Sequence, residues 1–162
     1  MPWGPSTKLF YYNSAMLKKV GATPADLNTW SGVLEVARKM KQQGVSKYPI
    51  SWSWAQAEAL ICDYAQVLGA FGGSFTDDGG KLDVNNAAGV EALTWMKKTL
   101  DEGLSNPGST TFLEDDVSKS MAQGGHGVLA ELGLDVPRSE RPEHLQDRRR
   151  ERRASHPGGT DG

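Results

Sequence analysis

The sequence predicts an α/β or α+β lobe in which helices surround a few short strands, followed by a C-terminal tail without a core. Capped segments with apolar residues at helical spacing alternate with short apolar strands, and no internal repeat appears. The composition then changes at Gly124, since ten lysines and one arginine precede this residue whereas seven arginines and no lysine follow it. All thirteen aromatic residues lie at or before Phe112, and in the tail only Val128–Val136 could bury anything, so the rest of the tail lacks the side chains of a core.

The chain begins with MPWGPSTKLFYYN, which joins a polar turn to an aromatic strand and ends at Asn13, a favourable helix N-cap. Trp3, with Ser6 and Thr7, offers a flat apolar face beside hydroxyl groups. Such a join suits a crossing between two bodies, where the chain bends and also faces a ligand. A surface turn that leads into a core strand is the alternative.

Helical spacing and capping residues predict five further helical segments, which are 14–20, 30–43, 56–70, 87–102 and a last short one from 115 or 116 to 123. Thr29 and Asn85 or Asn86 are the expected N-caps of the second and fourth. The third is expected to bury Leu60, Ile61, Tyr64, Val67, Leu68 and Phe71. The fourth is expected to bury Val90, Leu93, Met96 and Leu100, and the last Val117, Met121 and Ala122.

Two extended segments complete the expected lobe. Residues 48–52 form a short strand, and Pro49 places it early or at an edge. Residues 74–76 and 81–83 form a hairpin around Asp77-Asp78-Gly79-Gly80. The aspartates raise a calcium alternative, but the alternate-position ligands and distal glutamate of a calcium loop are missing, so turn chemistry is the preferred interpretation.

The totals limit the possible functions. The chain has 162 residues and a formal net charge of −2, which gives no general reason to expect a nucleic-acid or membrane partner. Cys62 is the single cysteine, so an internal disulfide is excluded, and it is expected to be a packing residue. No apolar run approaches the roughly 18 residues of a membrane span, and no secretory signal stands at Met1.

Catalytic patterns are weak. All three histidines lie after residue 125, so no base is available in the globular part to activate a nucleophile, and no metal-ligand spacing appears. We therefore expect no enzyme activity, metal or cofactor. One alternative is a glycoside-active fragment that uses Glu58 or Asp63. Another is an interaction module whose Arg148–Arg153 run contacts nucleic acid, although seven acidic residues balance the seven arginines of the tail.

Three tryptophans stand in polar loops and suggest a carbohydrate ligand. Trp3, Trp52 and Trp54 would each expose a large apolar face unless something covers it. Sugars have apolar C–H faces and hydroxyl groups, which match indole planes beside serine, threonine and glutamine side chains. Packing of the three rings against the helices of the lobe is the alternative.

Five motifs follow one another between Pro2 and Gly124, namely PWGPSTKLFYYNSAMLKKVGA, TWSGVLEVARKMKQQG, YPISWSW, GAFGGSFTDDGGKLDVNNAAGVEALTWMKKTLDEGL and DDVSKSMAQG. Together they resemble the extracellular sugar-binding proteins of ABC transporters, in the family 1 group related to maltose-binding protein. The chain departs from the family at Gly32, where an acidic residue is usual after the TW motif. This departure removes a capping box.

The resemblance implies a type II periplasmic-binding-protein fold, in which two α/β lobes joined by a hinge hold a sugar between them. Residues 1–13 would be the hinge or crossover strand, 14–124 part of the C-terminal lobe, and 125–162 a disordered, arginine-rich tail. The N-terminal lobe and a later sugar-stacking aromatic of the family are missing. We hypothesise a truncated gene product with a reading-frame shift near Gly124–His126.

The resemblance also implies the ligand-binding residues, which are Trp3, Ser6, Thr7, Trp52, Trp54 and Gln56. They would bind a mono- or oligosaccharide by stacking and hydrogen bonding, without catalysis, and the intact protein would deliver it to membrane permease subunits. Such a protein is expected to be a monomer, periplasmic or extracellular and lipoprotein-anchored, with no nucleic-acid partner. Half of a cleft is expected to bind sugar weakly or not at all, because lobe closure needs both lobes.

Overall fold

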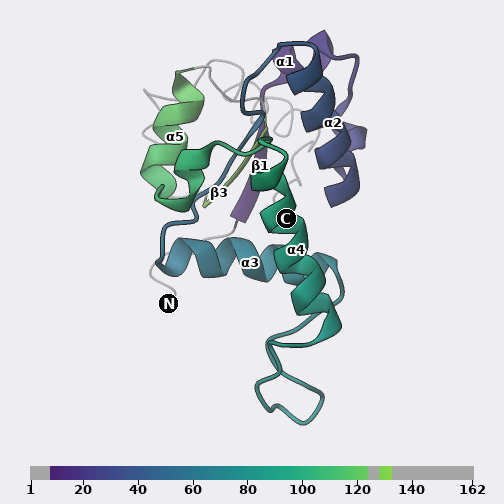
Figure 1. Cartoon of the computed structure of the whole chain (residues 1–162), viewed down its shortest axis with the longest axis vertical. Helices are drawn as coiled ribbons and strands as arrows, with labels where there is room; N and C mark the ends of the chain where they lie inside the picture. Colours follow the sequence, from purple (N-terminus) through teal and green to yellow (C-terminus); the bar gives the residue numbers. More distant parts are fainter. Residues whose placement is uncertain (1–7, 124–127, 133–162) are drawn as a thin grey trace, which may run out of the picture. The chain divides into compact units, whose positions relative to one another are not determined.

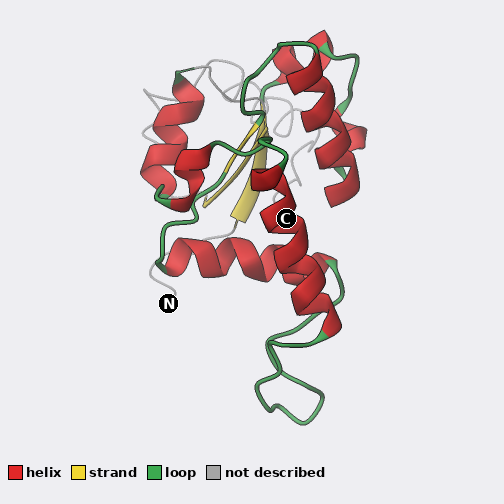
Figure 2. Ribbon diagram, viewed as in Figure 1, coloured by secondary structure: helices red, strands yellow, loops and turns green. Residues whose placement is uncertain are grey.

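The computed structural model describes residues 8–123 in full and the backbone of residues 128–132. Helices dominate this part of the chain, and the strands are short (Figures 1 and 2). The strands are β1 (Lys8–Tyr12), β2 (Ile50–Ser51) and β3 (Val128–Leu132). The α-helices are α1 (Ser14–Lys19), α2 (Trp30–Gln42), α3 (Glu58–Ala70), α4 (Ala87–Asp101) and α5 (Glu114–Ala122), with short 3-10 turns at η1 (Pro24–Leu27) and η2 (Pro107–Thr110).

The described strands form one small mixed sheet in the order β1-β3-β2. β3 pairs antiparallel with β1, from Lys8 opposite Leu132 to Tyr12 opposite Val128, and parallel with β2. The composition predicts that residues 128–132 belong to the tail, and this prediction is wrong for these residues because they form β3. Both neighbours of β3 supply backbone hydrogen-bonding partners, so a short segment that looks isolated in sequence is held in the middle of the sheet.

The predicted N-cap residues make the hydrogen bonds expected at the starts of their helices. The Asn13 side chain accepts hydrogen bonds from Ala15 N and Met16 N at 3.0 and 3.1 Å, and the Asn86 side chain accepts from Gly89 N at 2.8 Å. Thr29 likewise caps α2 through Gly32 N at 3.1 Å. A Cβ atom at position 32 would stand 2.0 Å from the Asp26 carbonyl oxygen. The departure from the family pattern therefore has a steric reason, because η1 approaches the start of α2 too closely for a side chain.

The hydrophobic core is built from most of the described helices and strands. It contains residues of α1, α2, β2, α3 and α4, and Phe10 and Tyr12 of β1 pack against it. α2 buries Val33, Leu34, Val36, Ala37 and Met40.

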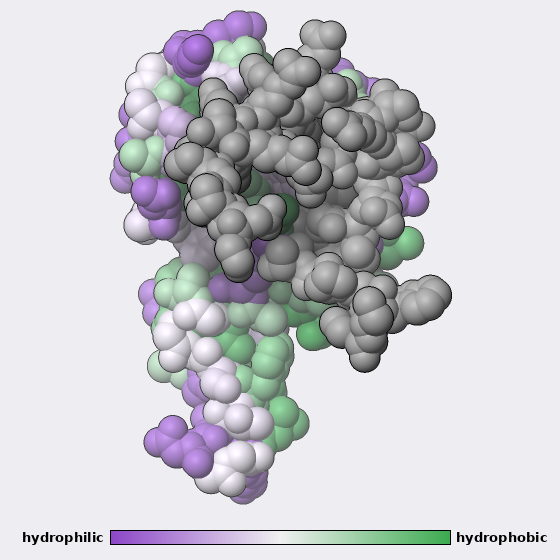
Figure 3. Space-filling model, turned by 180° about the vertical axis from the view of Figure 1, so that it is seen from behind, coloured by the Kyte–Doolittle hydropathy of each residue, from purple (hydrophilic) through white to green (hydrophobic). Residues whose placement is uncertain are grey.

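The predicted inner faces of α3 and α4 were partly wrong. Ile61 is 55% exposed, whereas Asp63 is buried in its place. Met96 is buried as predicted, but Val90 and Leu93 are 53% and 55% exposed, because α4 turns Ala92 and Trp95 toward the core instead. In Figure 3, apolar atoms run along one flank of the segment at the bottom of the view, which contains the hairpin and the start of α4. Ala122 of α5 is also exposed, contrary to prediction.

The hairpin prediction is confirmed, and the predicted strand is shorter than expected. Thr76 and Leu82 form an antiparallel bridge. The Asp77 carboxylate accepts hydrogen bonds from Gly79 N and Lys81 N at 3.0 and 2.9 Å, which is turn chemistry. Strand β2 covers only two of the five residues expected, because the chain leaves the sheet after Ser51 and reaches α3 at Glu58.

Candidate functional site

The carboxyl edge of the sheet carries one of the predicted site segments, the loop 52–57. Since Ser51 lies opposite Leu129 and Lys8 lies opposite Leu132, β2 runs toward the edge at which β1 begins. The loop 52–57 therefore starts on the side of Lys8, and ligands of α/β folds commonly bind beyond this carboxyl edge. Trp3, Ser6 and Thr7 precede Lys8 in the sequence, and their positions lie outside the described residues.

The tryptophan loop itself is packed inward. Trp52 is 1% exposed and Trp54 is 6% exposed. Their rings are stacked on each other with centroids 5.0 Å apart and an interplanar angle of 11°. Trp52 also contacts Trp30 at 5.9 Å and Trp95 at 6.0 Å. These buried rings present no open face to a sugar, so the structure does not support the expectation that Trp52 and Trp54 stack on it directly.

Serine side chains and backbone groups hold this loop from the side of η2. Trp52 N donates to Ser109 Oγ at 3.1 Å, and Trp54 N donates to the Ser109 carbonyl oxygen at 2.8 Å. The Trp52 indole N–H donates to Ser105 Oγ at 3.0 Å, which donates in turn to Thr99 Oγ1 at 2.7 Å. The buried Trp54 indole N–H has no acceptor among the described residues.

A buried ion pair holds the loop from the other side. Lys8 Nζ lies 2.7 Å from Asp63 Oδ1, and the two side chains are 9% and 0% exposed. Ser53 Oγ donates to the second carboxylate oxygen at 3.3 Å. Burial raises the pKa of the Asp63 carboxyl above its ordinary value of 3.8, whereas hydrogen bonding and the positive charge of Lys8, with Ser53, oppose this increase.

The glycosidase alternative loses its acidic residues in this arrangement. Both oxygens of Asp63 are engaged by Lys8 and Ser53, and its side chain is closed to solvent. Glu58 is exposed in the first turn of α3, where a carboxylate favours the positive end of the helix dipole. Cys62 is a free thiol of intermediate exposure, and the described residues contain no group of side chains able to hold a metal ion.

The predicted site residues thus separate into three groups. Gln56 is exposed in the loop at the carboxyl edge. Trp52 and Trp54 are buried, and Trp3, Ser6 and Thr7 remain outside the described residues. Sequence reasoning missed Lys8 and Ser53 as partners of Asp63. The available signal was the position of Asp63 between Ala59 and Val67 on the inner face of α3, where a buried carboxylate requires a partner.

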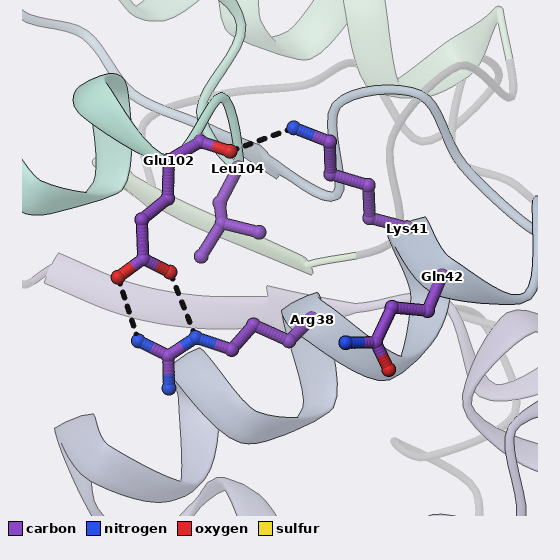
Figure 4. Close-up of a pocket in the computed structure, with 5 residues that line it drawn as sticks. All are labelled: Arg38, Lys41, Gln42, Glu102 and Leu104. Carbon is purple, nitrogen blue, oxygen red and sulfur yellow. Dashed lines mark hydrogen bonds and ion pairs between the residues drawn. The ribbon is translucent and has the colours of Figure 1, made fainter.

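A second depression lies between the C-terminal ends of α2 and α4 (Figure 4). The Arg38 guanidinium makes two hydrogen bonds of 2.7 and 2.8 Å to the Glu102 carboxylate, and Lys41 Nζ donates to the Glu102 carbonyl oxygen at 2.6 Å. The hydrogen bond from Arg38 lowers the pKa of Glu102 below its ordinary value of 4.5. Arg38 and Glu102 thus pair with each other, and Lys41 is held by backbone carbonyl oxygens, so these groups already have partners within the lobe.

Comparison with known proteins relates the chain to a transport family. A family model described as "Bacterial extracellular solute-binding protein" matches residues 1–135. A relative from Deinococcus radiodurans, named "Probable ABC transporter-binding protein", is 28% identical over 134 residues, which are 80% of this chain and 31% of the relative. No helix in the described part of the chain is long and apolar enough to cross a membrane.

Solved structures show the same similarity. Maltose-bound MalE3 of T. maritima aligns with a TM-score of 0.73 and 28% identity, covering 81% of this chain and 33% of that one. A solute-binding protein of an ABC transporter from Thermotoga lettingae, bound with α-D-tagatose, aligns with a TM-score of 0.67 and 26% identity over 78% of this chain and 33% of that one. The chain thus spans about a third of the length of the proteins that it matches.

Proposed function

Because this chain belongs to the bacterial extracellular solute-binding protein family, we propose that it is part of the substrate-binding component of an ABC sugar importer. The family match over residues 1–135 is the observation that carries the proposal. Sugar is the proposed solute class because maltose and α-D-tagatose occupy the similar structures. Members of this family are transport binding proteins and not enzymes, and the family description places them outside the cell.

The proposed ligand contacts lie at the carboxyl edge of the sheet. Gln56 would donate and accept hydrogen bonds from its exposed loop, and Ser6 and Thr7 would add hydroxyl groups from the segment that enters β1. Trp3 would supply the stacking face. The Trp52–Trp54 stack would support Gln56 from below.

The remaining two thirds of a relative's length would supply the second lobe, the rest of the cleft and the surface for permease subunits. Closure of two lobes on a sugar requires that the closed form bind it more tightly than the open form. One lobe cannot provide this difference, so we expect this chain alone to bind sugar weakly. The family match extends past Gly124–His126, so any reading-frame shift would have to lie later than the composition suggested.

Nuclear magnetic resonance titration with maltose tests the proposed site. We expect small amide shifts at Ser6, Thr7 and Gln56, with a dissociation constant of about 1 mM or weaker. A Gln56→Ala variant should weaken these shifts, whereas Gln43→Ala, which changes an exposed glutamine at the end of α2, should not.

Three outcomes would contradict the proposal. Shifts confined to another part of the chain, or no shifts at any accessible sugar concentration, would remove the carboxyl edge as a sugar site. Tight binding in a calorimetric titration would instead contradict the inference that a single lobe lacks most of the binding free energy.

A further inference from the structure

The buried ion pair between Lys8 and Asp63 requires an explanation, because transferring two charged side chains out of water is costly. Lys8 and Asp63 are 55 residues apart in sequence and make their contact with side chains that are 9% and 0% exposed. Buried ion pairs are weak contributors to stability, since desolvation opposes most of the attraction. Their directional hydrogen bonds can nevertheless fix the relative position of two segments.

The two oxygens of Asp63 contact two different segments of the candidate site. Oδ1 receives the hydrogen bond from Lys8, the first described residue of β1, which directly follows Ser6 and Thr7. Oδ2 receives the hydrogen bond from Ser53. In the sequence, Ser53 lies between Trp52 and Trp54, whose rings are stacked on each other. One carboxylate therefore connects the strand that enters the site with the loop that carries Gln56.

The loop also needs this connection for geometric reasons. Ser109 holds the backbone of Trp52 and Trp54 from the η2 side, at 3.1 and 2.8 Å. Those hydrogen bonds fix the loop relative to η2 and do not set its distance from β1. The contact through Asp63 adds a constraint in the direction of Lys8.

We propose that Lys8 and Asp63 are positioning residues of the ligand site, which act through Ser53 to set the tryptophan loop at a fixed distance from the entering strand. The inference rests on the proposed function, because it assigns the site to this edge. The spectroscopic part of its test does not depend on the proposed function, since it measures the geometry of the tryptophan loop in the absence of sugar.

The stacked indoles provide the readout. Two indole rings 5.0 Å apart couple their electronic transitions, so near-ultraviolet circular dichroism reports the geometry of the Trp52–Trp54 stack. In the full chain, Lys8→Met with Asp63→Leu replaces the ion pair by apolar groups and should retain the far-ultraviolet spectrum. We expect about a twofold loss of the near-ultraviolet signal, and a weaker maltose titration at Gln56.

Ser53→Ala is the second variant, because it removes only the hydroxyl bridge and leaves both charges paired. It should reduce the near-ultraviolet signal in the same direction even if the double variant fails to fold. The control is Arg38→Met with Glu102→Leu, which replaces the ion pair between α2 and α4 and should leave the tryptophan signal unchanged.

The results separate the two levels of inference. Native tryptophan spectra in Ser53→Ala, and in the double variant if it folds, would overturn the positioning role. A changed stack combined with an unchanged maltose titration would also overturn it, because the loop geometry would then not matter for the ligand. Absence of any maltose response in the unmodified chain would instead count against the proposed function and leave the spectral comparison intact.

Discussion

Two ion pairs of this lobe have the same chemistry and opposite surroundings. Lys8 and Asp63 meet with 9% and 0% of their side chains exposed, at the carboxyl edge of the sheet. Arg38 and Glu102 meet at the ends of α2 and α4 with 36% and 30% exposed (Figure 4). The first pair carries the full cost of desolvation, whereas the second keeps part of its hydration.

This difference in exposure shows where the fold contains a costly desolvated ion pair. The exposed pair joins two helix ends and completes a network with Lys41 and Lys98 at little cost. The buried pair joins the entering strand to the tryptophan loop, where an apolar pair would pack at least as well. A costly contact retained at the candidate site, and not elsewhere among the described residues, favours a role in positioning.

Removal of Lys8 should have the largest effect on this comparison. Lys8→Met leaves the Asp63 carboxylate buried without its cation, and we expect a loss of about 3 kcal/mol in the free energy of unfolding. Urea unfolding followed by far-ultraviolet circular dichroism measures the change. The matched control is Lys19→Met in α1, an exposed lysine whose replacement should change stability by less than about 0.5 kcal/mol.

A second variant shows whether the stability lost in Lys8→Met comes from the unpaired Asp63 charge or from the lost packing of the Lys8 side chain. Adding Asp63→Leu to Lys8→Met should recover most of the lost stability, because the unpaired charge is then gone. A single Lys8→Met variant as stable as the unmodified chain would mean that the pair is effectively hydrated, and the contrast with Arg38–Glu102 would disappear.

Replacement of the exposed arginine should have a smaller effect. Arg38→Met removes a bidentate contact that is partly screened by water, and we expect a loss of roughly 0.5–1 kcal/mol in the same unfolding experiment. Glu35→Gln on the same helix is the control, since Glu35 is exposed one turn before Arg38. A loss for Arg38→Met equal to that for Lys8→Met would show that burial does not distinguish the two pairs.

Local sequence signals predicted most of the helices, because caps and stops act within one turn. Asn13, Thr29 and Asn86 each accept the expected backbone hydrogen bonds. The rotation of α4 could not be read in the same way. Val90 and Leu93 fit an apolar stripe as well as Ala92 and Trp95 do, and contacts such as that between Trp95 and Trp30 decide which face turns inward.

The candidate site was harder to predict because its contacts are long-range. The sequence identified Trp3, Trp52 and Trp54 as unusual, but a loop tryptophan can face a ligand or the core with equal local plausibility. The middle position of β3 depends on pairing with strands more than 70 residues away, and no local pattern encodes such pairing. The partnership of Lys8 with Asp63 depends on that sheet.

The pH dependence of stability should have opposite signs for the two carboxylates. The pKa of Glu102 is lowered from 4.5, so the folded protein binds this proton less tightly than the unfolded chain, and the stability from Glu102 is lost as the pH falls below that value. The pKa of Asp63 is raised from 3.8, so the folded protein binds this proton more tightly and gains stability as the pH falls toward 3.8.

Unfolding free energies measured between neutral pH and about pH 3 would reveal these signs, which we expect to be the smallest of the three effects. The stability advantage of the unmodified chain over Glu102→Gln should shrink on acidification, since only the glutamate contributes a lowered pKa. The advantage over Asp63→Asn should grow instead, because asparagine cannot take up the proton. Parallel slopes for the two comparisons would mean that Asp63 stays charged and paired throughout, and that hydrogen bonding to Lys8 outweighs its burial.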